Sequence, residues 1–405
     1  MDDLLYLAHR IPYPPNKGDK IRSWNILRCL AEEYRVHLGC FIDDPADLIH
    51  RGKLEEICAS CHFATLDPRV ARLRSLSGLA TGAPLTLGYY RDRGLARWVA
   101  DLLGTHEIRR IFVFSSSMAQ YVLDDAATRA RLVIDFVDVD SDKWAQYARV
   151  KRWPESWVYR RESRLLLGFE RKAAAAAEVA LFVSDAEAAL FRRLAPESAA
   201  HTAALNNGVD LSYFTPDAEY PDPFRPDTEA LVFTGAMDYW ANVDAVTWFA
   251  REVLPGIRAR RPRVEFCIVG AHPASQVRAL ARQPGVTVTG RVDDVRPYVA
   301  HAALVVAPLR LARGVQNKVL EAMAMGKAVL GTPEAIEGIA ARTGEEVLCA
   351  GANGSFAEAA ISALDRFDRD EIGRRARLRA EADYGWSSNL AGLKTILAQP
   401  GVSQT

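Results

Sequence analysis

The segment from Leu304 to Thr332, LVVAPLRLARGVQNKVLEAMAMGKAVLGT, constrains the fold more than any other part of the sequence. Apolar residues from Leu304 to Ala307 predict a buried strand, and Pro308 marks its end because proline lacks a backbone donor. A polar loop follows, and then a helix is expected from about Gln316 to Met325, which Gly326 ends before a second apolar run. A strand, a helix and a second strand in this order indicate a parallel α/β unit.

The loop and helix start of this segment have the features of a phosphate-binding site. Arg310, Arg313 and Gly314 lie in the loop, and the N–H groups at a helix start favour a bound anion. Glu321 follows about one and a half turns into the helix, where its carboxylate is placed to accept hydrogen bonds from a sugar or ribose beyond the phosphates. In isolation, an ordinary βαβ connection with an exposed Glu explains the same pattern.

Length and charge limit the class of protein. The chain has 405 residues, enough for two domains, and a net charge of zero, so no basic field indicates nucleic acid. The N-terminus, MDDLLYLAHR, is acidic where a signal peptide is positive, and no apolar run approaches the ~20 residues of a membrane span. We therefore expect a cytoplasmic protein whose membrane contact, if any, is peripheral on the inner face of the membrane.

The N-terminal part begins as a second α/β unit. Leu4 to Ala8 and Val36 to Ile42 predict strands, with a helix from Lys20 to Glu33 between them. Gly18, in the preceding loop, is then expected at the carboxyl edge of a sheet, where open α/β folds bind ligands. It is either a plain turn residue or a place where a ligand approaches the backbone.

A cluster of acidic residues follows the predicted strand from Leu132 to Phe136. Asp135, Asp138, Asp140 and Asp142 crowd its end and offer either a metal site or a base, although Asp is also a common loop and cap residue. Asp138 is the candidate for a polar contact with a substrate.

Two segments of the sequence combine basic side chains with apolar or aromatic ones. Residues 69–103 interleave six Arg with apolar side chains, a pattern found in segments that lie on anionic membranes and equally in solvated surface helices. Residues 143–172 combine basic and aromatic side chains, which also suits RNA, but the chain lacks RNA-binding motifs.

Glycine ends each of three predicted strands in the second half of the chain. These strands run from Ala230 to Phe233, Val264 to Val269 and Val286 to Thr289, and are followed by Gly235, Gly270 and Gly290. Glycines at neighbouring strand ends indicate a nucleotide pocket, but no G-x-G-x-x-G or P-loop is present. The turn-rich segment LNNGVDLSYFTPD separates this series from the first one.

The order of motifs resembles the family-4 retaining glycosyltransferases of the GT-B type. Within that family the chain is most similar to the sugar transferases associated with exopolysaccharide and exosortase (PEP-CTERM) loci. The resemblance covers nearly the whole chain. The segments that carry it are HRIPYPPNKGDKIRSWNIL, VIDFVDVDSDKW, VSDAEAALF, NNGVDLSYF, FTGAMDYWANVDAV, TGRVDDVRPYVAHAALVVAPL and ARGVQNKVLEAMAMGKAV.

The resemblance implies an α/β fold with two Rossmann-like domains facing across a cleft. The acceptor domain is expected at 1–205, with a C-terminal crossover helix at about 386–402, and the sugar-nucleotide domain at 206–385. Glu321 matches the second Glu of the family's Glu-x7-Glu pattern, which holds the ribose. Gly290 to Val292 match the segment that contacts the base, and Gly18 matches a glycine near the donor phosphates.

The chain departs from the family pattern at two places. Residue 313, where the first Glu is expected, is Arg, and the Arg and Lys that often follow the strand from Ala230 to Phe233 are missing. We expect Arg310, Arg313 and Lys318 to neutralise the leaving diphosphate instead. The expected catalytic residues are Arg313, Lys318 and Asp138. The expected donor-binding residues are Gly18, Gly235, Gly290, Arg291, Val292, Arg310, Gly314, Gln316, Asn317 and Glu321.

The expected reaction is transfer of a sugar from a nucleoside diphosphate sugar to a hydroxyl acceptor, with retention of configuration. The expected acceptor is a lipid-linked saccharide of exopolysaccharide synthesis. No metal and no cofactor besides the donor are expected, because Arg and Lys serve the phosphates. The alternatives are a sugar-nucleotide epimerase on the same fold, a non-catalytic sugar-nucleotide or polysaccharide binding protein, and RNA binding through residues 143–172.

Overall fold

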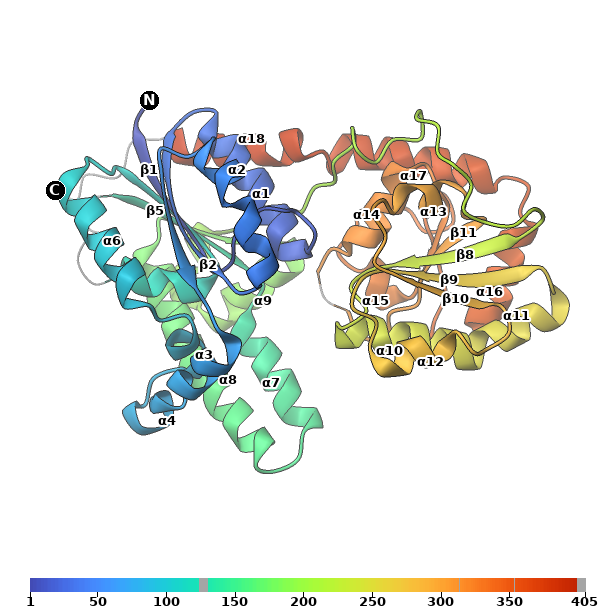
Figure 1. The fold of residues 1–405 in the computed structure, drawn as a ribbon, viewed down its shortest axis with the longest axis horizontal. Coiled ribbons are helices and arrows are strands. Elements are labelled where there is room, and N and C mark those ends of the chain that lie inside the picture. The colour runs from blue at the N-terminus through green and yellow to red at the C-terminus, as the bar shows by residue number, and fades with distance from the viewer. Residues whose placement is uncertain (124–129, 313, 353, 399–405) are drawn as a thin grey trace. The chain divides into compact units, whose positions relative to one another are not determined.

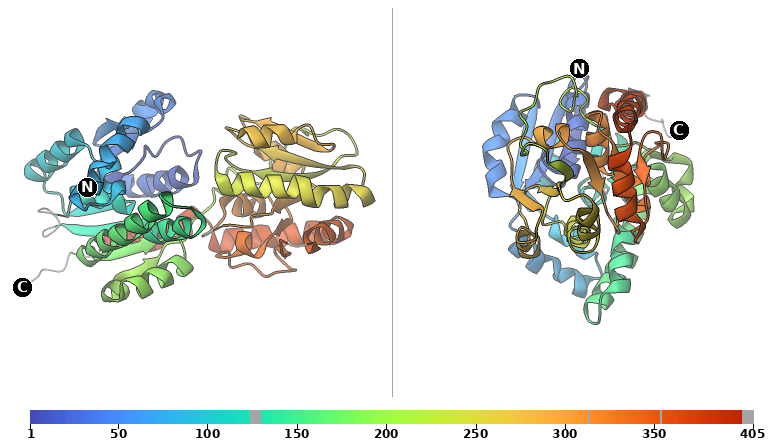
Figure 2. Two further views of the ribbon diagram at one scale, coloured as in Figure 1. Left: turned by 90° about the horizontal axis from the view of Figure 1, so that it is seen from below. Right: turned by 90° about the vertical axis from the view of Figure 1, so that its right-hand side faces the viewer.

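The computed structural model describes residues 1–123, 130–312, 314–352 and 354–398. The chain forms two compact units, each built on its own sheet (Figure 1). Unit 1 contains Met1–Asn206 and Leu390–Thr405, and unit 2 contains Asn207–Asn389. In each unit helices cover both faces of the sheet (Figure 2), which explains why the strands are continuous apolar runs.

The described part of the unit 1 sheet has the strand order β3-β2-β1-β4-β5-β6-β7, and all its pairings are parallel. The strands are β1 Asp3–Ala8, β2 Arg35–Ile42, β3 Ser60–Thr65, β4 Arg110–Phe114, β5 Arg131–Val137, β6 Val179–Phe182 and β7 Thr202–Ala204. The helices are α1 Gly18–Ala31, α2 Arg51–Glu55, α3 Pro68–Ser75, α4 Ser77–Thr81, α5 Leu85–Tyr89, α6 Arg93–Thr105, α7 Asp140–Val150, α8 Glu155–Ala176 and α9 Asp185–Leu194. Short 3-10 turns lie at η1 Pro45–His50, η2 Ser116–Tyr121 and η3 Pro196–His201.

The described part of the unit 2 sheet has the order β10-β9-β8-β11-β12-β13, again with parallel pairings. The strands are β8 Glu229–Thr234, β9 Val264–Val269, β10 Val286–Gly290, β11 Leu304–Ala307, β12 Val329–Gly331 and β13 Leu348–Cys349. The helices are α10 Trp240–Trp248, α11 Leu254–Arg260, α12 Ser275–Leu280, α13 Arg296–Ala300, α14 Asn317–Ala324, α15 Pro333–Ile336, α16 Ser355–Asp365 and α17 Arg369–Asp383, with a π turn η4 at Phe249–Val253.

The last helix, α18 (Trp386–Ala398), begins in unit 2 and ends in unit 1. Within unit 1 its Leu393 and Leu397 side chains are fully buried, and the Leu397 carbonyl accepts a hydrogen bond from Arg110 Nε at 2.7 Å. Its Lys394 ammonium lies 3.0 Å from Glu32, the residue that follows α1. The end of this helix is therefore part of the packing of unit 1.

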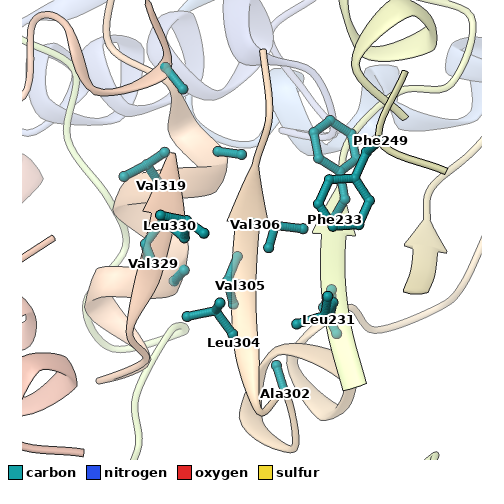
Figure 3. Packing of buried hydrophobic residues seen from close by; sticks show 14 of the residues in the cluster. Leu231, Phe233, Phe249, Ala302, Leu304, Val305, Val306, Val319, Val329 and Leu330 are labelled. Atoms are coloured by element: carbon teal, nitrogen blue, oxygen red, sulfur yellow. The ribbon is translucent and has the colours of Figure 1, made fainter. Parts of the chain in front are cut away.

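The predicted strand–helix–strand segment is confirmed as β11, α14 and β12. The two strands are neighbours in register, with Val305 opposite Val329 and Val306 opposite Leu330. Figure 3 shows Val319 of α14 packed over β12, with β11 lying between β12 and β8. The helix buries Val319, Leu320, Ala322, Met323 and Ala324 in this core, whereas Lys318 and Glu321 are only partly buried.

One predicted helix differs from the structure. The helix expected from Lys20 begins at Gly18, so Gly18 is a helical residue and not part of the loop. In unit 2, α10 continues through the π turn η4 into α11. Among the described residues, no helix is long and apolar enough to cross a bilayer.

Candidate functional site

Three neighbouring strands of unit 2 end in glycines, and the backbones at these strand ends form hydrogen bonds and close contacts with one another. The Gly235 N–H donates to the Val269 carbonyl at 3.0 Å, and the Gly270 N–H donates to the Gly290 carbonyl at 3.2 Å. A Cβ on Gly270 would lie 1.7 Å from the Gly235 carbonyl oxygen, and the φ of Gly270 is 156°. Only glycine fits there, so the pattern read from the sequence has a steric cause at Gly270.

Lys318 extends from the first turn of α14 to the end of β8. Its Nζ donates to Asn242 Oδ1 at 3.0 Å and lies 4.9 Å from the centre of the Phe233 ring. Asn242 Nδ2 in turn donates to the Ala236 carbonyl at 2.9 Å. The ammonium is therefore held beside the glycine turn at Gly235, where a side chain would meet Asn242 Nδ2 at 2.8 Å.

Burial changes the ionisation of Lys318 and of Glu321, one turn further along the same helix. It lowers the pKa of Lys318 to about 8, against the opposing effect of the Glu321 charge. It raises the pKa of Glu321 to about 7, and the Lys318 charge opposes that shift. Among the described residues, no group donates a hydrogen bond to the partly buried Glu321 carboxylate. The carboxylate thus retains its capacity to accept hydrogen bonds from a ligand.

The start of α14 is held by polar contacts within unit 2. Gln316 precedes the helix in an extended conformation, and its Nε2 donates to the Gly314 carbonyl at 3.3 Å. Asn317 Oδ1 accepts from Asn207 Nδ2 at 3.3 Å. The first N–H groups of a helix have no partner within the helix, so this turn offers donors and the positive end of the helix dipole.

Of the three predicted cations, the structure describes Arg310 and Lys318, which contact different residues of α10. Arg310 turns to α10, where its Nη2 and Nε lie 2.5 and 3.0 Å from the Asp244 carboxylate and its guanidinium lies 5.6 Å from the Trp248 ring. It lines an open cavity of about 400 Å³ on that side of the unit. Arg313 lies outside the described residues. Of the expected cations that the structure describes, Lys318 is the one at the strand ends.

The segment expected to contact a base follows β10. Gly290 has a φ of 70°, Arg291 is exposed, and Val292 packs partly against the core. Sequence reasoning missed Arg296 just beyond it, whose Nη2 pairs with Asp294 at 2.7 Å and whose guanidinium lies 3.9 Å from the Tyr213 ring. Tyr213 and Asp294, the two partners of Arg296, are 81 residues apart in the chain, so no local sequence pattern links them.

In unit 1 the acidic cluster is divided among cations. Asp135 is fully buried and accepts from Arg22 Nε of α1 at 2.7 Å. Asp138 and Asp140 accept from Lys143 Nζ at 2.7 and 3.2 Å. Across the described residues, no group of three or more His, Cys, Asp or Glu side chains is arranged to hold a metal ion. Asp138 is therefore a paired carboxylate at the end of β5.

The end of β1 carries a polar group that sequence reasoning missed. His9 stacks on Phe114 at 5.8 Å, and its Nε2 lies 3.4 Å from Asp19 Oδ2 in the first turn of α1. Arg10 also approaches Asp19, at 2.5 Å. The available signal was a histidine directly after a predicted strand. Gly18 lies next to Asp19, so the structure places the expected glycine beside this cluster.

Comparison with known proteins agrees with the division of the chain into two units. Residues 228–366, which lie in unit 2, match the family model described as Glycosyl transferases group 1. A search of curated proteins finds no match. Solved structures match over almost the full chain at low identity, which is evidence about the fold.

Three of these structures are informative. HepE of Anabaena in complex with UDP-glucose has a TM-score of 0.68 at 15% identity, covering 98% of this chain and 100% of that one. Sucrose-phosphate synthase of Thermosynechococcus elongatus has 0.67 at 16%, covering 98% of each chain. WaaG, a glycosyltransferase involved in lipopolysaccharide biosynthesis, has 0.65 at 16%, covering 98% and 100%. The fold is thus α/β of the GT-B type, as predicted.

Proposed function

We propose that this chain is a retaining glycosyltransferase that moves a sugar from a nucleoside diphosphate sugar to a hydroxyl acceptor. The observation that carries the proposal is the Lys318 ammonium, held by Asn242 beside the glycine-ended strands. One turn away lies the Glu321 carboxylate, to which no residue in the described part of the chain donates a hydrogen bond. The match of residues 228–366 to a glycosyltransferase family supports it, because that segment contains both side chains. The complex of the similar fold HepE with UDP-glucose supports the choice of donor class.

Lys318 and the first turn of α14 act on the diphosphate in this proposal. As the bond from the anomeric carbon to the diphosphate breaks, negative charge grows on the leaving oxygens, and a fixed ammonium and helix N–H groups stabilise it. The acceptor oxygen attacks from the same face and passes its proton to the leaving diphosphate, so no protein nucleophile is required. Glu321 accepts hydrogen bonds from the ribose hydroxyls.

In this proposal, Lys318 and Arg313 replace a pair of cations that this chain lacks. Family members often carry Arg and Lys after the strand equivalent to β8. Here Asn242 of α10 donates to the Ala236 carbonyl in the turn after β8, and Lys318 of α14 brings its ammonium to the Asn242 amide oxygen. Arg313, in the preceding loop, is proposed as the second cation. Arg310 contributes less, because Asp244 already neutralises it. Arg313→Ala and Lys318→Ala are each expected to lower turnover by about 10²-fold or more.

For the acceptor we propose a lipid-linked saccharide of exopolysaccharide synthesis, bound by unit 1, with the enzyme on the inner face of the cytoplasmic membrane. Asp138 is the proposed polar contact to the acceptor, and its ion pair with Lys143 favours a role in orienting a hydroxyl over one as a base. Residues 69–103 are the proposed membrane-contacting segment.

Thermal-shift measurements with UDP-, GDP-, ADP- and TDP-sugars test the donor site, because a ligand that binds only the folded state raises the Tm. We expect one nucleotide series to stabilise the protein. Incubation of that donor, labelled in the sugar, with lipid-linked saccharides is then expected to give a glycosylated acceptor of unchanged anomeric configuration. Donor binding without any turnover contradicts transfer and favours a binding protein, whereas an epimerised free donor favours an epimerase.

A further inference from the structure

The helices α7 and α8 form a hairpin whose turn exposes large apolar side chains. Inside the hairpin Trp144 packs against Tyr147 and Tyr159, with ring centres 6.0 and 5.2 Å away. At its turn, in contrast, Val150, Trp153 and Trp157 are 78%, 80% and 54% exposed. We call these three residues the aromatic tip. The hairpin extends away from the sheet of unit 1 (Figure 1).

A second exposed apolar group lies beside the hairpin in unit 1. It consists of Val70 and Leu73 on α3, Leu76 between the two helices, and Leu79 on α4. These side chains are between 42% and 71% exposed, and we call the group the apolar ridge. By contrast, α6, the other part of the predicted membrane segment, buries its apolar residues Leu95, Val99 and Leu102 against the sheet. The structure thus divides residues 69–103 into a part with an unpartnered apolar face and a part without one.

Polar contacts fix the ridge segment to the hairpin. Arg161 Nη2 of α8 donates to the Gly78 carbonyl of α4 at 2.5 Å. The buried Glu162 of α8 accepts from the Leu85 and Thr86 N–H groups of α5 at 2.7 and 2.8 Å. In Figures 1 and 2 the hairpin and α3–α4 extend from the same side of unit 1. The tip and the ridge therefore belong to one side of one compact unit.

Basic residues surround both apolar groups. The stretch 68–81 holds three Arg and no Asp or Glu, and the stretch 149–164 holds six Lys or Arg against two Glu. One of those acids, Glu162, is buried on backbone N–H groups, and the other, Glu155, pairs with Lys151. Exposed tryptophans with surrounding cations match the interface of a bilayer with anionic lipids, where indole rings lie at the headgroup level.

We propose that the aromatic tip and the apolar ridge together dock unit 1 on an anionic lipid bilayer, with the two tryptophans as the main anchors. The inference deepens the proposed membrane contact and moves its centre from residues 69–103 to the hairpin turn. Both segments follow the carboxyl ends of parallel strands, β3 and β5, so they lie at the sheet edge that also carries His9 and Asp138. A membrane-borne acceptor would then be delivered to the polar edge of unit 1.

Co-sedimentation of the full chain with vesicles tests the proposal. We expect binding to phosphatidylglycerol/phosphatidylcholine vesicles that weakens steeply between about 0.05 M and about 0.5 M salt, and little binding to phosphatidylcholine alone. Trp153→Ala and Trp157→Ala are each expected to lower vesicle affinity about tenfold, because each removes a large apolar side chain from the interface. Phe367→Ala, which removes a fully exposed aromatic from unit 2, is the matched control and is expected to bind as the wild type does.

Four results overturn the inference: no binding to anionic vesicles, equal binding to neutral vesicles, full binding by the double tryptophan variant, or equal losses in that variant and in Phe367→Ala. A self-association that disappears in the double variant while vesicle binding is absent identifies a second copy as the occupant instead. The readout is independent of glycosyl transfer. A protein that binds vesicles and shows no thermal shift with any nucleotide sugar supports the docking surface and contradicts the proposed function, and the reverse pair of results does the opposite.

Discussion

Replacement of Glu321 by Gln removes a carboxyl group whose ionisation the folded protein opposes. Burial raises the pKa of Glu321 from 4.5 to about 7. Because the folded pKa lies above the unfolded one, the wild type is at its full relative stability below pH ~4.5 and loses stability as the pH rises towards 7. The difference between these two pKa values corresponds to about 3 kcal/mol of stability, which the variant regains above pH 7.

We therefore expect Glu321→Gln without ligand to be more stable than the wild type at pH 8, by up to about 3 kcal/mol, with the difference vanishing towards pH 4.5. Denaturant unfolding at several pH values measures it. The same variant is expected to lose most of its thermal shift with the nucleotide sugar that stabilises the wild type, because an amide accepts fewer hydrogen bonds than a carboxylate and donates where a ribose hydroxyl must donate.

Glu346→Gln in the same unit is the matched control with the opposite sign. Although burial acts to raise the pKa of Glu346, hydrogen bonds from Arg379 and Arg342 hold it at about 2. This variant is expected to be less stable than the wild type above pH ~4.5, where the carboxylate is ionised in both states. If Glu321→Gln is destabilised at pH 8 as well, the burial argument for Glu321 is wrong. If it keeps the full thermal shift, the ribose role is wrong.

Three further predictions concern the cations and glycines of unit 2. Lys318→Ala is expected to lower turnover by about 10²-fold or more, whereas Arg310→Ala is expected to lower it less than about tenfold because Asp244 already neutralises Arg310; equal losses in steady-state assays would contradict this division of roles. As the pH rises through about 8, kcat/KM is expected to fall because Lys318 loses its proton, and Lys318→Arg, which stays charged, is expected to remove that fall even if its overall rate is lower. Gly270→Ala is expected to destabilise unit 2 by more than about 3 kcal/mol or to prevent folding, because the new Cβ would lie 1.7 Å from a carbonyl oxygen. Thermal unfolding measures the effect, and Gly256→Ala, whose Cβ would lie 3.8 Å from its nearest neighbour, is the control.

The order of strands and helices could be predicted from the sequence because buried parallel strands are short apolar runs. Glycines at the ends of these strands, where a larger residue would clash, mark their boundaries. The segment from Leu304 to Thr332 is the clearest case, since its strand–helix–strand pattern is confirmed in position and direction. Gly270 is a second, because the chain accepts no other residue so close to the Gly235 carbonyl. Local patterns of this kind are determined within about 30 residues of sequence.

Pairings between distant residues could not be predicted in the same way. Arg310 and Asp244 are 66 residues apart, and Lys318 and Asn242 are 76 apart, so only the folded chain decides which cation is neutralised and which reaches the strand ends. The amphipathic pattern of residues 69–103 was ambiguous for a related reason. An apolar stripe predicts that a helix face is covered but not by what, and α6 covers its face with the sheet.

The final helix has a consequence for the synthesis of the protein. Residues 390–398 complete the packing of unit 1, where Leu393 and Leu397 are fully buried, although they are made after the whole of unit 2. The first 206 residues therefore leave the ribosome without one of the helices of their unit, and their core closes only after residues 390–398 have been synthesised. A nascent chain stalled before residue 390, or a C-terminal truncation there, leaves the Arg110 side chain and the apolar surface beneath α18 open to solvent. The part of the chain that is synthesised first is thus the part that is completed last.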